Sequence, residues 1–160
     1  MIRHIKLRDM TENEYINWKE WSLANYTKEL IETGQYSEDE AKPQAEKDFS
    51  MLTNGLATPG NYFFIAENDD TTPVGMIWYI IQDADRIFIA DFMVYDKYRR
   101  MGYGSAILTE LECRLKPERF SIIVLHVFEH NKPAIELYKK FGYKIAQKTD
   151  NGGMYMEKQF

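Results

Sequence analysis

The stretch YRRMGYGSAIL, from Tyr98 to Leu108, decides the fold. Two arginines lead into Gly-x-Gly, and an apolar helical pattern begins directly behind them. The segment before it, RIFIADFMVY over residues 86–95, is nearly all apolar and predicts a central strand buried on both faces. A strand that passes through glycines into a helix start predicts a phosphate-binding turn, because N–H groups there are unpaired and glycine lets an anion come close. On the tripeptide alone, a tight turn flanked by solvated arginines is an equal alternative.

Two other nucleotide-binding loops fit this stretch less well. A P-loop requires Gly-Lys-Ser/Thr, but Gly104 is followed by Ser105 and Ala106 with no lysine. A dinucleotide fingerprint needs a third glycine where this chain has Ile107, and an acidic residue about 20 positions further on at a strand end. Neither is present, so we do not expect a dinucleotide-binding domain.

Hydrophobic periodicity and turn residues divide the chain into short strands and four helices. Two capping boxes, Thr11–Glu14 and Ser37–Glu40, predict the starts of the first two helices. An apolar stripe carries the second helix to Leu56, and Pro43 either kinks it or marks its first turn. The expected strands cover residues 2–8, 61–67, 73–82, 86–95, 120–128, 143–148 and 154–158, and the expected helices cover 11–33, 37–56, 102–116 and 131–140. This order predicts one α/β domain over residues 1–160, a mixed sheet with helices on its faces.

Composition narrows the class of protein. The chain has 160 residues, of which 44% are hydrophobic, and a net charge of −5, which argues against general nucleic-acid binding. The single cysteine, Cys113, excludes an internal disulfide, fits a reducing compartment and is predicted to pack in the core. No apolar run reaches the roughly 18 residues of a membrane helix, and the first residues alternate like a strand rather than forming a signal peptide. We therefore expect a cytoplasmic protein that binds neither nucleic acid nor a membrane.

Two motifs resemble those of a known family. The run Arg99-Arg100-Met101-Gly102-Tyr103-Gly104 is similar to Arg/Gln-x-x-Gly-x-Gly/Ala, the acetyl-CoA pyrophosphate signature of the GNAT N-acetyltransferases. The preceding DFMVYDKY resembles the fourth strand of that family, and LHVFEHNKPAIELYKKFGY over residues 125–143 resembles its second motif. The capping-box helices and GLATPG over 55–60 are similar to a bacterial branch of uncharacterised GNAT proteins.

The resemblance implies an α/β fold with a largely antiparallel central sheet and helices on both faces. It also implies an acyltransferase that moves an acetyl group from acetyl-CoA to a primary amine by direct attack, without a covalent enzyme intermediate and without a metal. Dimers are common in the family, which makes a homodimer one expected assembly, but the sequence identifies no interface.

The resemblance also implies which residues hold the donor. The pantetheine arm would pair with backbone groups of Met93, Val94 and Tyr95. The pyrophosphate would lie on N–H groups of the segment 100–104, with Arg99 and Arg100 adding attraction. Asn131 caps the last helix and would also help to bind the cofactor or position the acceptor.

Catalytic candidates follow from the same motifs. Tyr138 lies two helical turns after Asn131, and in the family this tyrosine can protonate the departing CoA thiolate. A phenol with a pKa near 10 holds its proton at neutral pH, so it can act as a general acid; packing in the core is the alternative. Asp91, the one charged residue within its apolar strand, and His126 are candidates for the general base. Purely structural roles for Asp91 and His126 stay open.

The first two expected helices suggest the acceptor. Residues 9–56 contain 11 acidic and 4 basic side chains, a balance that would steer a cationic amine into a cleft below them. The alternative is that these acids are solvated caps and helix faces. Tyr15, Trp18, Trp21 and Tyr26 crowd the first helix; some must be core, and one or two could wall a pocket. We expect a small cationic amine or a peptide amine as acceptor, with a non-catalytic acyl-CoA sensor as the alternative function.

Overall fold

A computed structural model describes residues 3–160 and contains one seven-stranded sheet in the order β1-β2-β3-β4-β5-β7-β6. The strands are β1 Lys6–Asp9, β2 Asn61–Glu67, β3 Pro73–Asp83, β4 Arg86–Val94, β5 Ile122–Phe128, β6 Lys144–Lys148 and β7 Gly153–Gln159. The helices are α1 Glu12–Glu32, α2 Glu38–Phe49, α3 Tyr103–Leu115 and α4 Lys132–Lys140. All neighbouring strands are antiparallel except β4 and β5, which are parallel. The predicted element order and the mixed, largely antiparallel sheet are confirmed.

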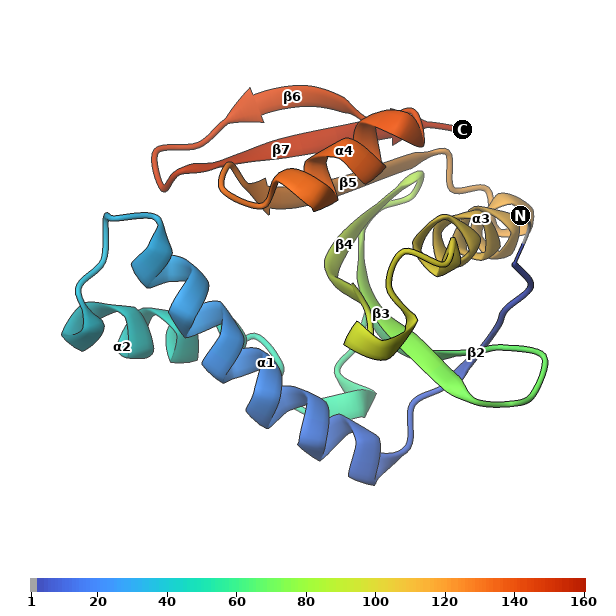
Figure 1. Cartoon of the computed structure of the whole chain (residues 1–160), viewed down its shortest axis with the longest axis horizontal. Coiled ribbons are helices and arrows are strands. Elements are labelled where there is room, and N and C mark those ends of the chain that lie inside the picture. Colours follow the sequence, from blue (N-terminus) through green and yellow to red (C-terminus); the bar gives the residue numbers. More distant parts are fainter. Residues whose placement is uncertain (1–2) are drawn as a thin grey trace.

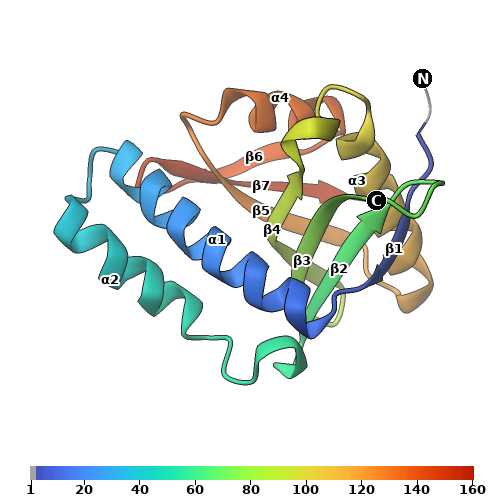
Figure 2. The ribbon, with the colours of Figure 1, turned by 60° about the horizontal axis from the view of Figure 1, so that its bottom comes forward.

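Helices cover both faces of the sheet, as Figure 2 shows. Alternate residues of β2 divide between two apolar clusters, because successive side chains of a strand point to opposite faces. Phe63 and Ile65 pack with Trp18 of α1, whereas Phe64 and Ala66 pack in the cluster that contains Ile107 of α3. The helices α1 and α2 therefore lie on one face, and α3 and α4 lie on the other.

The sheet opens between its two parallel strands. Residues Arg86 to Ile89 of β4 pair with Ile122 to Leu125 of β5, and beyond Ile89 the two strands share no further register. Figure 1 shows β5, β7 and β6 with α4 as one part of the molecule and β2, β3 and β4 with α3 as another. The second half of β4 thus leaves one of its edges unpaired beside a gap.

A β-bulge at Ala90 decides which way the second half of β4 faces. Trp78 pairs with Asp91, but the next residue of β3, Tyr79, pairs with Ile89, so Ala90 is an extra residue. Without it, Asp91 would point to the same face as Ile89, into the apolar core below α3. The bulge instead turns Asp91 toward α1, where Trp18 meets it.

Two predictions about the helical region need correction, and one of the two alternatives for Pro43 is excluded. The second helix ends at Phe49, and Leu56 lies in a separate 3-10 turn over Gly55–Ala57. Pro43 lies inside α2 rather than in its first turn. Cys113 is exposed rather than packed in the core, because the buried residues of α3, among them Leu111 and Leu115, occupy the opposite side of that helix.

Two further observations concern the first strand and the helices. The first strand begins at Lys6, later than the predicted start at Ile2, which lies outside the described residues. Within residues 3–160, the helices fall short of the combination of length and apolar character that crossing a membrane requires.

Candidate active site

A cavity of about 670 Å³ opens where β4 and β5 part, beneath α1. Aromatic side chains from both helices and both halves of the sheet line it, together with the carboxylates of Glu29, Asp48 and Asp91. Of the 11 acids of residues 9–56, only Glu29 and Asp48 line this cleft. Most of that acidic charge therefore lies on other surfaces of the two helices, and the cleft has an aromatic and acidic wall.

The loop before α3 has the backbone that a phosphate site requires. Gly102 is the N-cap of α3 with φ 87°, a left-handed conformation that favours glycine, and Arg100 also has a positive φ of 62°. Among residues 3–160, no side chain caps the first turn of α3, so its N–H groups are available to an anion. Gly104 serves packing as well, because a Cβ there would lie 3.1 Å from Leu137 of α4.

The β4 backbone offers one edge to a ligand in the gap. The N–H of Tyr95 donates to the carbonyl of Val74 of β3 at 2.9 Å. Because backbone groups of an antiparallel strand alternate in direction, Met93 also bonds toward β3, whereas Phe92 and Val94 point toward the gap. Of the three residues expected to pair with pantetheine, Val94 is the one whose backbone faces it. Its carbonyl accepts a hydrogen bond from Nε of Arg99 at 3.0 Å.

Tyr138 lies on α4 with 8% of its surface exposed, and its side chain lines the cleft. Its ring packs against Phe92 and Tyr143 at centroid distances of 6.2 and 5.7 Å. The hydroxyl has no hydrogen-bond partner among residues 3–160. Burial, followed by the negative charges of Asp91 and Glu29, raises the pKa of Tyr138, so the hydroxyl keeps its proton throughout the neutral range.

Asn131 caps α4, as predicted, since its Oδ1 accepts the N–H of Ala134 at 3.3 Å. It also lines the cleft, on the same side as Tyr138. The helix therefore begins with a residue whose side chain is engaged in capping and whose position borders the proposed donor site.

Asp91 is partly buried, and its carboxylate accepts three hydrogen bonds. Its Oδ2 accepts from Nε1 of Trp18 at 2.8 Å and from Oγ of Ser22 at 3.0 Å, and its Oδ1 accepts from the N–H of Phe92 at 2.9 Å. Burial raises the pKa of Asp91, and these three hydrogen bonds oppose the rise. The carboxylate lines the cleft but is largely occupied by the protein itself.

His126 lies on β5, across the gap from β4, and lines the cleft. A Cβ on Gly153 of β7 would collide with its ring, so the glycine makes room for the histidine. Burial lowers the pKa of His126, and Asn151 partly offsets this effect, so the imidazole is neutral at pH 7. The other nearby histidine, His130, is exposed and pairs with Glu32 at 3.2 Å away from the cleft.

Glu29 was missed in the sequence. It is partly buried on α1, lines the cleft and accepts a hydrogen bond from Nδ2 of Asn25 at 2.9 Å. Burial, together with the charges of Asp91 and Glu32, raises the pKa of Glu29 to about 7. A signal did exist, because Ser22, Asn25 and Glu29 recur at helical spacing and form a polar stripe on an aromatic helix.

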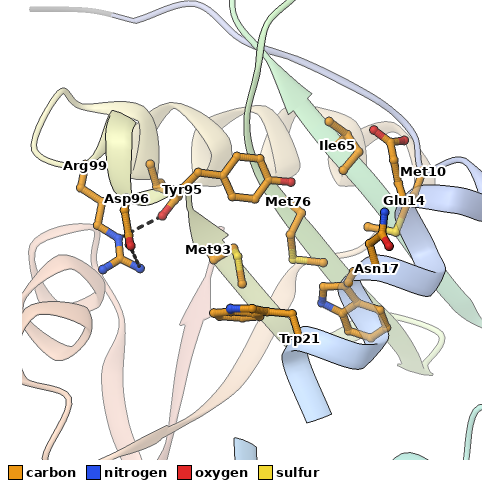
Figure 3. Close-up of a pocket in the computed structure, with 12 residues that line it drawn as sticks. Met10, Glu14, Asn17, Trp21, Ile65, Met76, Met93, Tyr95, Asp96 and Arg99 are labelled. Atoms are coloured by element: carbon orange, nitrogen blue, oxygen red, sulfur yellow. Dashed lines mark hydrogen bonds and ion pairs between the residues drawn. The ribbon is translucent and has the colours of Figure 1, made fainter. Parts of the chain in front are cut away.

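A second, smaller pocket of about 370 Å³ adjoins the cleft and shares Trp21, Met93 and Arg99 with it. Figure 3 shows its apolar wall, with Met76 and Met93 between Trp21 and the ring of Tyr95. As expected, the first helix supplies both core and wall: Tyr15 and Trp18 are buried, while Trp21 is 50% exposed and borders both cavities.

Known proteins share this sequence pattern and fold. The acetyltransferase (GNAT) family matches residues 15–143. The uncharacterized N-acetyltransferase YdgE of Bacillus subtilis (strain 168) is 32% identical over 144 residues, which cover 88% of this chain and 92% of that protein. This chain therefore belongs to the GNAT acetyltransferase family.

Solved structures agree with this assignment. The crystal structure of YycN from Bacillus subtilis has a TM-score of 0.86 and 26% identity, and the match covers 91% of this chain and 95% of that one. The PaiA N-acetyltransferase of Thermoplasma acidophilum, solved in complex with coenzyme A, has a TM-score of 0.66 and 22% identity over 98% and 99% of the two chains. At that identity the second likeness shows the fold alone.

Proposed function

We propose that this protein transfers the acetyl group of acetyl-CoA to a primary amine by direct attack, with Tyr138 as the acid that protonates the departing thiolate. The observation that carries the proposal is Tyr138, a mostly buried residue that lines the cleft where β4 and β5 part and whose hydroxyl, unpaired among residues 3–160, is not sealed off from that cleft.

The loop before α3 and the unpaired edge of β4 support a position for the donor along the cleft. The N–H groups at the start of α3, together with the turn that the positive φ of Gly102 allows, support pyrophosphate binding. Arg100 and Met101 belong to the same turn, and the first helical residue, Tyr103, continues it. The edge of Val94 supports an extended pantetheine arm running from this loop toward Tyr138.

The transfer balances with these groups. The nitrogen lone pair attacks the thioester carbon, the C–N bond forms, and the C–S bond breaks as Tyr138 gives its proton to the sulfur. The nitrogen loses a proton in the same sequence, which restores the hydroxyl of Tyr138. Asp91 accepts three hydrogen bonds and holds α1 against β4, so we assign it a positioning role. His126, on β5 across the gap from β4, supports acceptor binding as a neutral imidazole.

The acidic and aromatic cleft supports a small cationic amine as acceptor, since carboxylates and ring faces both attract ammonium groups. The adjoining apolar pocket supports an acceptor that also carries an apolar group, as a peptide amine can. We further propose one cytoplasmic domain, for which the exposed thiol of Cys113 suits a reducing compartment. A homodimer is a prediction of the family resemblance alone.

The test is amine-dependent release of CoA by the purified protein, recorded with and without a primary amine after acetyl-CoA binding has been measured. Release that requires the amine supports the proposal. Tight binding of acetyl-CoA with no release in the presence of any amine would favour the alternative, a non-catalytic acyl-CoA sensor.

A further inference from the structure

We propose that Glu29 receives the ammonium group of the acceptor and removes its proton before the nitrogen attacks. This inference rests on the proposed acetyl transfer and adds a residue and a ligand chemistry to it. Its basis is the difference among the three carboxylates of the cleft.

The three carboxylates differ in how many donors the protein gives them. Within residues 3–160, Asp91 accepts three hydrogen bonds. Asp48 accepts two, from Tyr26 and Gln44. Glu29 accepts one, from Asn25 to Oε1. A carboxylate offers about four acceptor positions, so Glu29 is the least satisfied acid in the cleft, and its Oε2 is free within the described residues. A primary ammonium carries three N–H donors and can supply what is missing.

The charged groups near Glu29 do not supply the donors that its carboxylate lacks. Asp91 faces it from β4, Asp48 lines the same cleft from α2, and Glu32 adds negative charge from the next turn of α1. The one arginine that lines the cleft, Arg99, pairs with Asp96 at 3.2 Å. The site therefore has an excess of negative charge that a cation from outside would balance.

Three other titratable side chains of the cleft do not compete for the proton. His126 on β5 has a lowered pKa and is neutral. Tyr138 on α4 and Tyr26 on α1 have raised pKa values and stay protonated. With a pKa of about 7, Glu29 is partly ionised at neutral pH and able to accept a proton there. Burial raises the pKa of Asp91 as well, but three hydrogen bonds from the protein already engage that carboxylate.

The proton balance of this step is simple. The ammonium group enters as a cation and binds to the ionised carboxylate of Glu29. One N–H proton moves to a carboxylate oxygen, which frees the nitrogen lone pair for the thioester carbon. After transfer, Glu29 gives its proton to solvent, while the second proton lost by nitrogen replaces the one that Tyr138 gave to sulfur.

The variant Glu29→Gln tests this directly, with 1,4-diaminobutane as the probe amine. In the wild type, kcat/KM should rise with pH through an apparent pKa of about 7, because only ionised Glu29 can bind and deprotonate the ammonium. In Glu29→Gln this acidic limb should vanish and kcat/KM should fall by about 100-fold. Glu29→Asp, which keeps a carboxylate, should recover part of the loss.

Glu32→Gln is the matched control, since it removes the same charge one turn further along α1 from a residue paired with His130. It should retain the acidic limb, moved slightly to lower pH because a negative charge near Glu29 is lost. Calorimetry adds a readout without turnover: Glu29→Gln should bind 1,4-diaminobutane at least tenfold more weakly and acetyl-CoA equally well.

The outcomes separate the two proposals. Turnover of the diamine by Glu29→Gln with an unchanged pH profile and unchanged diamine affinity would overturn the role of Glu29 and leave acetyl transfer standing. A wild type that binds acetyl-CoA and acetylates no primary amine would overturn both. A variant that loses acetyl-CoA binding together with the diamine would mark Glu29 as structural and overturn its assignment to the acceptor.

Discussion

Replacing Tyr138 with Phe removes one oxygen atom and isolates the acid step. The hydroxyl has no partner among residues 3–160 and borders the cleft, so its loss should leave the free energy of unfolding nearly unchanged. A general acid typically contributes 10²–10⁴-fold in rate, which corresponds to about 3–5 kcal/mol of transition-state stabilisation. We therefore expect kcat to fall at least 100-fold while the affinity for acetyl-CoA stays within a few-fold of the wild type.

The chain supplies a control for this prediction. Tyr143 packs beside Tyr138, but its hydroxyl is fully buried without a partner among residues 3–160 and it does not line the cleft. Tyr143→Phe should therefore keep full activity. The assay should follow CoA by mass spectrometry, because the exposed thiol of Cys113 would react with a thiol reagent. Equal kcat in Tyr138→Phe and Tyr143→Phe would refute the role of Tyr138 as the acid.

Three further changes test the loop, the strand and an ion pair. Gly102→Ala should weaken acetyl-CoA binding more than tenfold, as measured by calorimetry. Gly34→Ala is its control, because Gly34 has a similar positive φ and lies in open space. Each variant should cost about 1–2 kcal/mol of stability, but Gly34→Ala should leave the affinity for acetyl-CoA unchanged. Asp91→Asn sets an amide against three hydrogen-bond donors and should cost about 1–3 kcal/mol of stability in urea unfolding. The acidic limb of its pH–rate profile should move to lower pH, because a negative charge near Glu29 is lost. Arg8 lowers the pKa of Glu14 from 4.5 to about 2. Glu14→Gln should therefore cost about 1 kcal/mol of stability at pH 7 and little near pH 2, where about half of the wild-type carboxylate is protonated and most of its extra stabilisation is already lost.

Local chemistry in the sequence was sufficient for much of the fold. The capping boxes at Thr11 and Ser37 are present in full, with side-chain and backbone bonds in both directions. Gly34 has the positive φ expected of a helix stop, and Asn131 caps the last helix. These features act within one or two turns of chain, so neighbouring residues determine them.

Features that depend on distant parts of the chain could not be predicted from the sequence. Nothing around Ala90 marks a bulge, because the extra residue is defined only by its pairing with β3. The importance of Glu29 depends on burial and on the approach of Asp91, which lies 62 positions further along the chain. Cys113 looked apolar enough for the core, but α3 buries a different side. The donor motif was readable because a phosphate loop is local, whereas the acceptor site is assembled from α1, α2, β4 and β5.

The most direct test of the central claim is mass spectrometric detection of product after incubation with acetyl-CoA and a panel of diamines, aromatic amines, amino acids and short peptides. We predict one acetylated class of primary amine, formed with an equal amount of free CoA, and a loss of that product in Tyr138→Phe. Acetyl-CoA that binds tightly and stays intact in the presence of every amine would contradict the account and identify the protein as an acyl-CoA binder without turnover.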